Sequence, residues 1–300
     1  QAAKLLGDVR YSRAADALVA LLSDPEARAR FFAAEALGRI GHRPAVQPIV
    51  QMLEENDGED VYLRQAGATA LARIGDAEAL GALSEHPSRA VRIAAVVALR
   101  RMKDPAVGRF VTDADEYVVT EAARAINDDG GIEGALPALA TVLEDPRFTA
   151  EPLIRRAVNA NLRLGTAEAA ERVADYALRN GGGDALRAEG VAVLGVWPEP
   201  SILDRVDGYH IGAMQRDTAI ARTALARLVE PLFASGSPEV QVALADAVAR
   251  LRLTDAAPTL LAKVSDGQTP EVRIAALQAL QTLGDSRIGE AVRTALRDQD

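Results

Sequence analysis

Apolar residues recur along the chain at the spacing of one helix face. In residues 88–103 the apolar positions are Val91, Ala94, Ala95, Ala98, Leu99 and Met102. A spacing of three to four residues places such side chains on one buried side of a helix. Val and Ile elsewhere in the chain follow the same helical spacing and not the alternation of a strand. We therefore predict an all-α protein.

Proline, glycine and short polar turns divide this pattern into successive helices. Asp24-Pro25 begins one of them, because Asp can cap a helix and Pro fits its first turn. Gly41 ends that helix, since glycine readily takes the left-handed conformation of a C-cap. The sequence predicts helices over residues 12–22, 25–40, 44–55, 60–74, 77–84, 88–102, 105–111, 115–126, 132–143, 150–164, 166–179, 184–194, 218–233, 238–251, 256–264, 270–283 and 287–296.

A shared register among these helices indicates a repeat. An Arg precedes a C-terminal Gly by eleven residues in the pairs Arg30 and Gly41, Arg64 and Gly75, and Arg273 and Gly284, with Lys103 in the Gly position after Arg92. A unit of roughly 30 residues that recurs in this way is typical of a solenoid. We predict one right-handed α–α superhelix over residues 1–300, with about eight or nine helix pairs. Both ends lack a polar capping repeat, so we expect a segment of a longer chain.

Residues 196–217 do not fit the repeat. They hold the only Trp of the chain, and loops of this length are often functional. They can form a lengthened connection in which Trp197 packs on the solenoid. Alternatively, they can contact a partner through Trp197, Arg205, Tyr209 and His210.

Charge and composition exclude several classes of protein. The chain has 34 Lys and Arg against 43 Asp and Glu, a formal net charge of −9. Nucleic-acid binding is unfavourable for such a chain, because it depends on neutralising phosphates with Lys and Arg. No cysteine is present, which excludes disulfides and a Cys nucleophile. No apolar run approaches the roughly 18 to 20 residues that span a bilayer, so we expect no membrane insertion.

The recurring Asp-Pro, Val-Arg, Ala-Ala, Ala-Leu-Gly and Ile-Gly elements resemble HEAT-like repeats, of the bacterial type first associated with phycobilisome lyases. The resemblance covers most of the chain and is weak across residues 183–237. It implies a curved solenoid in which the second helix of each pair lines the concave surface.

A narrower resemblance involves residues 104–129 and 197–210. They are similar to the HEAT segment of bacterial multidomain proteins, in which a sorbosone- or glucose-dehydrogenase-like β-propeller precedes the repeats and a c-type cytochrome domain follows. The second match rests on Trp197, Pro200, Ser201, Asp204, Arg205, Val206 and Gly208. The resemblance implies a spacer or docking module in an exported or periplasmic protein, and without it a cytoplasmic location is expected. No residue here carries the redox chemistry of that family.

Two sets of residues on the second helices are candidates for function. A partner-facing strip on the concave surface is expected to contain Phe31, Glu35, Arg39, Thr69, Arg73, Val97 and Arg101, although the same positions fit a solvated face. The arginines near the helix starts are Arg30, Arg64, Arg92, Arg187 and Arg273. As a recurring set they could form a ladder of binding residues. We expect them instead to be structural, pairing with turn residues such as Asp24, Asp60, Asp113 and Asp266.

Candidates for catalytic or metal chemistry are weak. His42, His86 and His210 lie far apart in sequence and form no H-x-x-x-H pair. Asp128 and Asp129 lack the alternating oxygen spacing of a calcium loop. No Ser lies in a G-x-S-x-G context. We expect no catalytic residue, no metal and no cofactor.

These observations favour a non-catalytic module that binds a protein, or adjacent domains of its own polypeptide, through the concave surface. One alternative is a lyase or chaperone-like enzyme of the phycobilin-lyase HEAT class. A third hypothesis is a HEAT-like protein that binds nucleic acid, which the acidic net charge disfavours.

Overall fold

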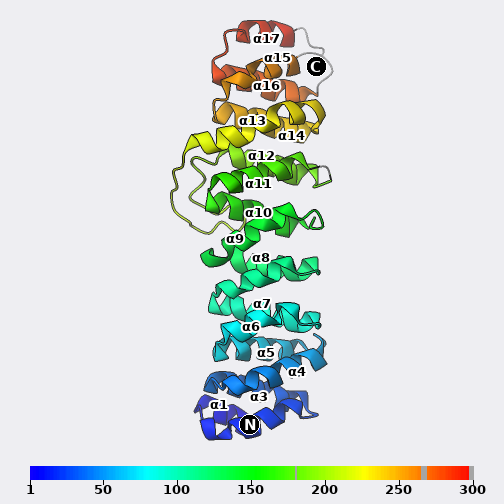
Figure 1. Cartoon of the computed structure of the whole chain (residues 1–300), viewed down its shortest axis with the longest axis vertical. Helices are drawn as coiled ribbons and strands as arrows, with labels where there is room; N and C mark the ends of the chain where they lie inside the picture. Colours follow the sequence, from blue (N-terminus) through cyan, green and yellow to red (C-terminus); the bar gives the residue numbers. More distant parts are fainter. Residues whose placement is uncertain (180, 265–268, 297–300) are drawn as a thin grey trace. The chain divides into compact units, whose positions relative to one another are not determined.

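The structure is a computed structural model that describes residues 1–179, 181–264 and 269–296. In these ranges every regular element is a helix (Figure 1), apart from one isolated antiparallel bridge between Leu203 and His210. The chain forms two compact units, residues 1–139 (unit 1) and 140–300 (unit 2), where the sequence predicts one solenoid. Within each unit, helix pairs follow one another in the order of the sequence. The prediction of an all-α solenoid fold is confirmed.

Unit 1 begins with one helix and continues as pairs in which the second helix is the longer. Its α-helices are α1 (Ala2–Asp8), α2 (Ala15–Ala20), α3 (Ala27–Ile40), α4 (Val46–Asn56), α5 (Val61–Ile74), α6 (Ala77–Ala82), α7 (Arg89–Met102) and α8 (Glu116–Asn127). The 3-10 helices are η1 (Ser12–Ala14), η2 (Leu21–Ser23), η3 (Arg43–Ala45), η4 (Leu83–Glu85), η5 (Pro105–Thr112) and η6 (Glu133–Ala135). The first helix of the fourth pair, predicted as an α-helix, is therefore the 3-10 helix η5, a geometry that suits short segments.

Unit 2 repeats this arrangement with one long interruption. After α9 (Leu136–Ala140), which lies at the boundary of the units, its helices are η7 (Thr141–Glu144), α10 (Glu151–Leu164), α11 (Ala167–Leu178), α12 (Asp184–Gly195), α13 (Thr218–Ser235), α14 (Pro238–Arg250), η8 (Thr254–Ala256), α15 (Ala257–Lys263), α16 (Pro270–Leu283) and α17 (Ile288–Ala295). Residues 196–217, between α12 and α13, form the long loop at the left of Figure 1.

Local sequence explains where the second helices begin and end. Asp60 accepts hydrogen bonds from the N–H groups of Tyr62 and Leu63, and so caps the start of α5. Gly41 ends α3 with φ 74°, the conformation that glycine adopts without steric cost. Lys103, in the same register, ends α7 with φ 53°, so this turn is made even where a side chain makes it less favourable.

The second helices of unit 1 pack side by side through small residues. In the order α1, α3, α5 and α7, each lies against the next. Gly38 of α3 faces Ala70 of α5 so closely that a Cβ atom built on Gly38 would lie 2.7 Å from the Ala70 Cα. Gly7 of α1 meets Ala36 of α3 at the same distance. Glycine costs a helix roughly 1 kcal/mol relative to alanine, and here its lack of a side chain permits the close approach.

Gly38→Ala is therefore expected to destabilise the protein by about 1–3 kcal/mol, because the added methyl group forces α3 and α5 apart. Gly190→Ala in α12 is the matched control. Its added Cβ would find its nearest neighbour, Val173, at 3.6 Å, an ordinary contact. The control should be neutral or stabilising by up to about 1 kcal/mol through helix propensity. Urea unfolding of both variants tests this, and equal shifts would contradict the packing argument.

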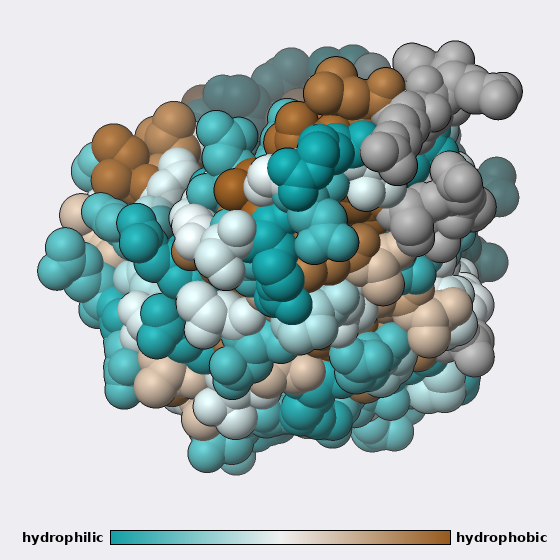
Figure 2. All heavy atoms as spheres, turned by 90° about the horizontal axis from the view of Figure 1, so that it is seen from above, coloured by the Kyte–Doolittle hydropathy of each residue, from teal (hydrophilic) through white to brown (hydrophobic). Residues whose placement is uncertain are grey.

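Some hydrophobic residues are exposed at the end of the chain that carries the last helices. Figure 2 shows the end of the chain that carries α17, where hydrophobic residues form small groups among hydrophilic ones. Three residues of the last helices are exposed: Ile274, Val292 and Leu296. The expectation that the chain is a segment of a longer one stays a prediction.

Candidate functional site

The arginines near the starts of the second helices are structural in three of the five predicted positions. Arg30 donates to the carbonyl of Asp24 at 2.7 Å, and Arg187 donates to that of Ala177 at 2.9 Å. Arg92 donates to the carbonyl of His86 at 2.8 Å and to both carboxylate oxygens of Asp113, at 2.7 and 3.3 Å. Arg30 and Arg92 tie the turn before their own helix to its first turns, and Arg187 ties the last turn of α11 to α12.

The other two arginines differ. Arg64 is exposed, and in the described part of the chain its side chain forms no hydrogen bond or ion pair. Its expected partner Asp60 is used as the helix cap instead. Arg273, in contrast to Arg64, does interact with another group of the chain. Asp266, another expected partner, lies outside the described residues.

The predicted partner-facing strip of unit 1 contains a row of ion pairs that crosses three helices. Glu35 of α3 binds Arg39 of the same helix at 3.4 Å and Arg73 of α5 at 2.9 Å. Arg39 in turn binds Asp8 of α1, and Asp8 also binds Lys4 at 2.8 Å. Because these charges neutralise one another, the row acts first as a set of links between neighbouring second helices.

The remaining strip residues are also engaged or partly covered. Arg101 of α7 donates to the hydroxyl of the buried Thr69 in α5 at 2.5 Å. Phe31 packs edge-on against Phe32, with ring centroids 5.2 Å apart, and lines a small hollow of about 180 Å³ with Glu35 and Arg39. Val97 is half-buried. The structure thus brings the strip residues onto adjoining helices and leaves little unpaired charge among them.

In residues 196–217, which we call the insertion, Trp197 is an internal packing residue. Its side chain has no exposed surface, so it cannot contact a partner, and the contact interpretation of this residue is corrected. Arg216 lies over the ring at 5.7 Å and donates to the carbonyls of Trp197 and Arg163, each at 3.3 Å. The second of these bonds satisfies the C-terminal end of α10, where a cation is favourable. Burial lowers the pKa of the Arg216 guanidinium below its usual value.

A buried carboxylate fixes the rest of the insertion. Asp204 is 4% exposed and accepts a hydrogen bond from the Asn159 side chain of α10 at 2.7 Å. The same carboxylate accepts from the backbone N–H of Val206 at 2.9 Å. The backbone N–H of Asp204 donates to the carbonyl of Tyr209 at 2.8 Å, which closes a narrow turn. Arg205 is thereby held on the surface, next to an anchored residue.

Tyr209 and His210 lie on the exposed side of this turn. No group of three or more His, Cys, Asp or Glu in the described residues is arranged to hold a metal ion. The aspartates considered for a calcium loop follow another course, since Asp129 binds Arg100 at 2.9 Å.

Arg205 lines a groove on the exposed face of α12 and α14 in unit 2, which we call the α12–α14 groove. Its volume is about 550 Å³, and its lining residues are Arg155, Ala185, Ala188, Glu189, Ala192, Val196, Arg205, Glu239, Val242, Ala243, Asp246, Ala247 and Arg250. Alanines form much of its floor, and charged residues surround them. Arg155 and Glu189 bind each other at 3.3 Å.

Four other charges of this groove are exposed and unpaired. Among the described residues, the side chains of Arg205, Arg250, Glu239 and Asp246 form no ion pair or hydrogen bond. This sets the groove apart from the strip of unit 1, where the charges are mutually satisfied. Of the four, sequence reasoning identified Arg205 alone. Glu239, Asp246 and Arg250 are spaced by seven and four residues, which places them on one face of one helix and is the signal that could have identified them.

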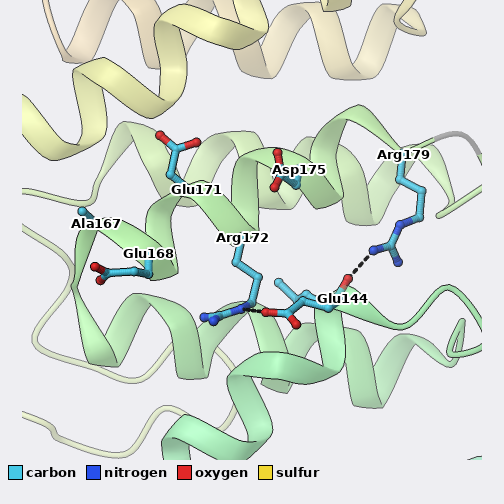
Figure 3. Close-up of a pocket in the computed structure, with 8 residues that line it drawn as sticks. Glu144, Ala167, Glu168, Glu171, Arg172, Asp175 and Arg179 are labelled. Atoms are coloured by element: carbon cyan, nitrogen blue, oxygen red, sulfur yellow. Dashed lines mark hydrogen bonds and ion pairs between the residues drawn. The ribbon is translucent and has the colours of Figure 1, made fainter.

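A second hollow lies on the first-helix side of unit 2, between η7 and α11, and has a volume of about 610 Å³ (Figure 3). Its charges are largely paired. Arg172 binds Glu144 at 2.5 Å, and Arg179 donates to the carbonyl of Leu143. Arg227 of α13 binds Glu171 and Asp175, the second at 2.8 Å. The α12–α14 groove is therefore the better candidate for binding.

Comparison with known proteins identifies the repeat type. HEAT repeats are matched over residues 1–62 and 225–300. The alpha subunit of a phycocyanobilin lyase from Picosynechococcus sp. is 39% identical over 82 residues, a match that covers 25% of this chain and 30% of the relative. The chain thus matches less than a third of the length of that protein.

Among solved structures, an engineered protein matches with a TM-score of 0.44 and 19% sequence identity. The match covers 100% of this chain and 90% of the engineered protein. Human deoxyhypusine hydroxylase in complex with glycerol matches with a TM-score of 0.37 and 22% sequence identity. The match covers 93% of this chain and 99% of the hydroxylase. No helix in the described residues is long and apolar enough to cross a membrane.

The relationship to an enzyme subunit overturns the expectation that the chain is not an enzyme. That expectation was wrong because it was drawn from the lack of a nucleophile and of metal-ligand pairs. An enzyme can also accelerate a reaction by orienting a reactant and by moving protons with carboxylates, which HEAT repeats can supply. Taken together, the HEAT repeats matched over residues 1–62 and 225–300 and the recurring helix pairs support a HEAT-like repeat family.

Proposed function

We propose that the chain is a HEAT-repeat scaffold that binds a protein partner in the α12–α14 groove. The observation that carries this proposal is the set of four unpaired charges around an alanine floor. An unpaired surface charge loses less on binding than one already paired, because no internal ion pair has to be broken. Packed repeats also hold the groove in place before binding, so little ordering is lost on association.

The predicted strip of unit 1 is a weaker candidate for the same role. Glu35, Arg39 and Arg73 would have to exchange their ion pairs for contacts with a partner. Exposed ion pairs are worth only about 0.2–1 kcal/mol each, so this exchange is feasible but brings little gain. We therefore assign the primary contact to unit 2 and leave the strip as a secondary surface.

The name of the related cyanobacterial protein supports the proposal in one respect. It is called a subunit, and a subunit works in contact with another chain. The match covers 82 residues of this chain, and a partner-binding role agrees with the word subunit in the name of the relative.

Selection of binding peptides tests the proposal. Random peptides displayed on phage are selected on the full chain and then measured against Arg205→Glu/Arg250→Glu. We expect the enriched peptides to lose at least about tenfold in affinity, because two attractive contacts become repulsive. The matched control is Arg13→Glu/Arg64→Glu, which makes the same change in net charge at exposed arginines of unit 1 and should leave affinity unchanged. Equal binding to all three proteins would refute the groove as the partner site.

A second candidate function is catalysis of the type named in the relative, a phycocyanobilin lyase subunit, which the 39% identity favours. The α12–α14 groove would then supply arginines for the carboxylates of a bilin and Glu239 or Asp246 for proton transfer. Mixing the full chain with phycocyanobilin should change the absorption spectrum of the pigment in this case, and Arg205→Glu/Arg250→Glu should reduce the change. An unaltered spectrum would count against this candidate.

A further inference from the structure

The charges of the α12–α14 groove are ordered along its length. On α14 the lining residues Glu239, Val242 with Ala243, Asp246 with Ala247, and Arg250 follow at intervals of three to four residues. They therefore lie along one face of the helix. Glu239 lies at the start of the helix, Asp246 one turn before its end, and Arg250 at its last position. At 1.5 Å per residue, Glu239 and Arg250 are about 16 Å apart along the helix axis.

The opposite wall of the groove is formed by α12 and by the residues that follow it. Ala185, Ala188 and Ala192 of α12 follow one another at helical spacing and present methyl groups. Val196, just after the end of α12, lines the groove as well, and Arg205 of the insertion joins it. Gly195 and Ala247 bring the C-terminal parts of α12 and α14 close together. Arg216 joins the end of α10 to Trp197, just after α12, and Asp204, the neighbour of Arg205, binds Asn159 in the C-terminal half of α10. We therefore assign Arg205 and Arg250 to the same end of the groove.

A floor of methyl groups at helical spacing suits another helix. Small residues allow two helix axes to approach to about 8 Å, so that the ridges of one fit between those of the other. Helices that dock in grooves use contacts at i, i+3, i+4 and i+7, the intervals at which the two walls repeat. An extended segment would place its side chains at a period of two and would match the floor poorly.

We infer that the groove binds a helical segment of a partner protein that carries basic side chains at one end and acidic side chains at the other, about eleven residues apart. The basic end faces Glu239, and the acidic end faces Arg205 and Arg250. This inference rests on the proposed function and specifies the partner that the groove accepts. Its basis is charge complementarity with side chains that have no partner among the described residues.

Synthetic peptides provide the test. The probe is an alanine- and leucine-containing helix of 15 residues with two Glu in its first turn and two Lys in its last, an arrangement that also suits the helix dipole. One comparison peptide has the same composition with Glu and Lys at i, i+4, where they pair internally. Another has Pro at its centre, which breaks the helix. Binding to the full chain is measured by fluorescence anisotropy at low and high salt.

We expect the probe to bind at least about tenfold more tightly than either comparison peptide and to weaken with salt. Arg205→Glu/Arg250→Glu should lose the probe and gain affinity for a peptide with Lys in all four charged positions. The control Arg13→Glu/Arg64→Glu should bind the probe as the unaltered chain does. Circular dichroism confirms that each variant retains its helices, and surface substitutions of this kind seldom affect folding.

The outcomes separate this inference from the function on which it rests. Equal binding of the probe and the internally paired peptide would overturn the inferred charge order. Equal binding of the helical and Pro-containing peptides would overturn the helical form of the partner. If the probe fails while phage-selected peptides still depend on Arg205 and Arg250, the inference is wrong and the proposed function stands. If no peptide depends on these arginines, both are wrong.

Discussion

Trp197→Ala is expected to destabilise unit 2 by about 3–5 kcal/mol, the cost of removing a fully buried large aromatic side chain. Trp197 has no exposed surface and lies beneath Arg216, which in turn binds the end of α10. Loss of the ring therefore leaves a cavity and also frees the guanidinium that connects the insertion to the helices. Both effects act on the same part of the unit.

Trp197→Phe should cost much less. The Nε1 of Trp197 is buried and has no hydrogen-bond partner among the described residues, and such a donor costs about 1–3 kcal/mol. Phe removes that donor while retaining most of the apolar contact. Tyr209→Ala is the control in the same insertion, because Tyr209 is 51% exposed, and it should change stability by no more than about 0.5 kcal/mol.

Urea unfolding followed by far-ultraviolet circular dichroism measures these differences, since the two Trp197 variants lack the only Trp that fluorescence could use. Repeat proteins can unfold in stages, so the transition that contains unit 2 is the one to compare. Similar midpoints for Trp197→Ala and Tyr209→Ala would show that the insertion does not depend on its buried ring.

Arg92→Met is expected to cost about 3–5 kcal/mol, because it leaves a carboxylate buried without its cation. The side chains of Arg92 and Asp113 are 14% and 4% exposed, and two hydrogen bonds join them. Arg92 also holds the carbonyls of His86 and Pro87. Its loss therefore removes a paired charge and loosens the turn before α7.

Arg100→Met, on the same helix, is the matched control. Arg100 binds Asp129, but these side chains are 39% and 80% exposed, and exposed pairs contribute little. The control should lose no more than about 0.5 kcal/mol. Adding Asp113→Asn to Arg92→Met should recover part of the loss, since the uncompensated charge is removed. Urea midpoints that fall equally for Arg92→Met and Arg100→Met would contradict this account of the Arg register.

Local features of the fold could be predicted from the sequence because local physics determines them. The apolar spacing around Val91 and Leu99 predicted a buried helix face, and both residues are fully buried. Gly41 was predicted to end its helix and does so in the left-handed conformation. The predicted partner of Arg92, Asp113, binds it in the structure. Each of these features depends on residues within one repeat or its neighbour.

Features that depend on packing between repeats were not predictable in the same way. From the sequence, Glu35 is expected on the surface. Only the position of α5 in the structure shows that Arg73 neutralises its charge. Arg250 could not be placed beside Arg205 before the course of the insertion was known. The position of Trp197 depended on the same information, and the sequence left both packing and contact open.

Cross-linking of a bound helix shows whether a partner lies in the α12–α14 groove. A photoreactive group at the centre of the 15-residue probe is activated in complex with the full chain, and the attachment sites are mapped by mass spectrometry. If the groove is the partner site, attachment falls within residues 185–196 and 239–250 and is lost in Arg205→Glu/Arg250→Glu. Attachment concentrated on α3 and α5 of unit 1, or attachment unchanged in that variant, would contradict it.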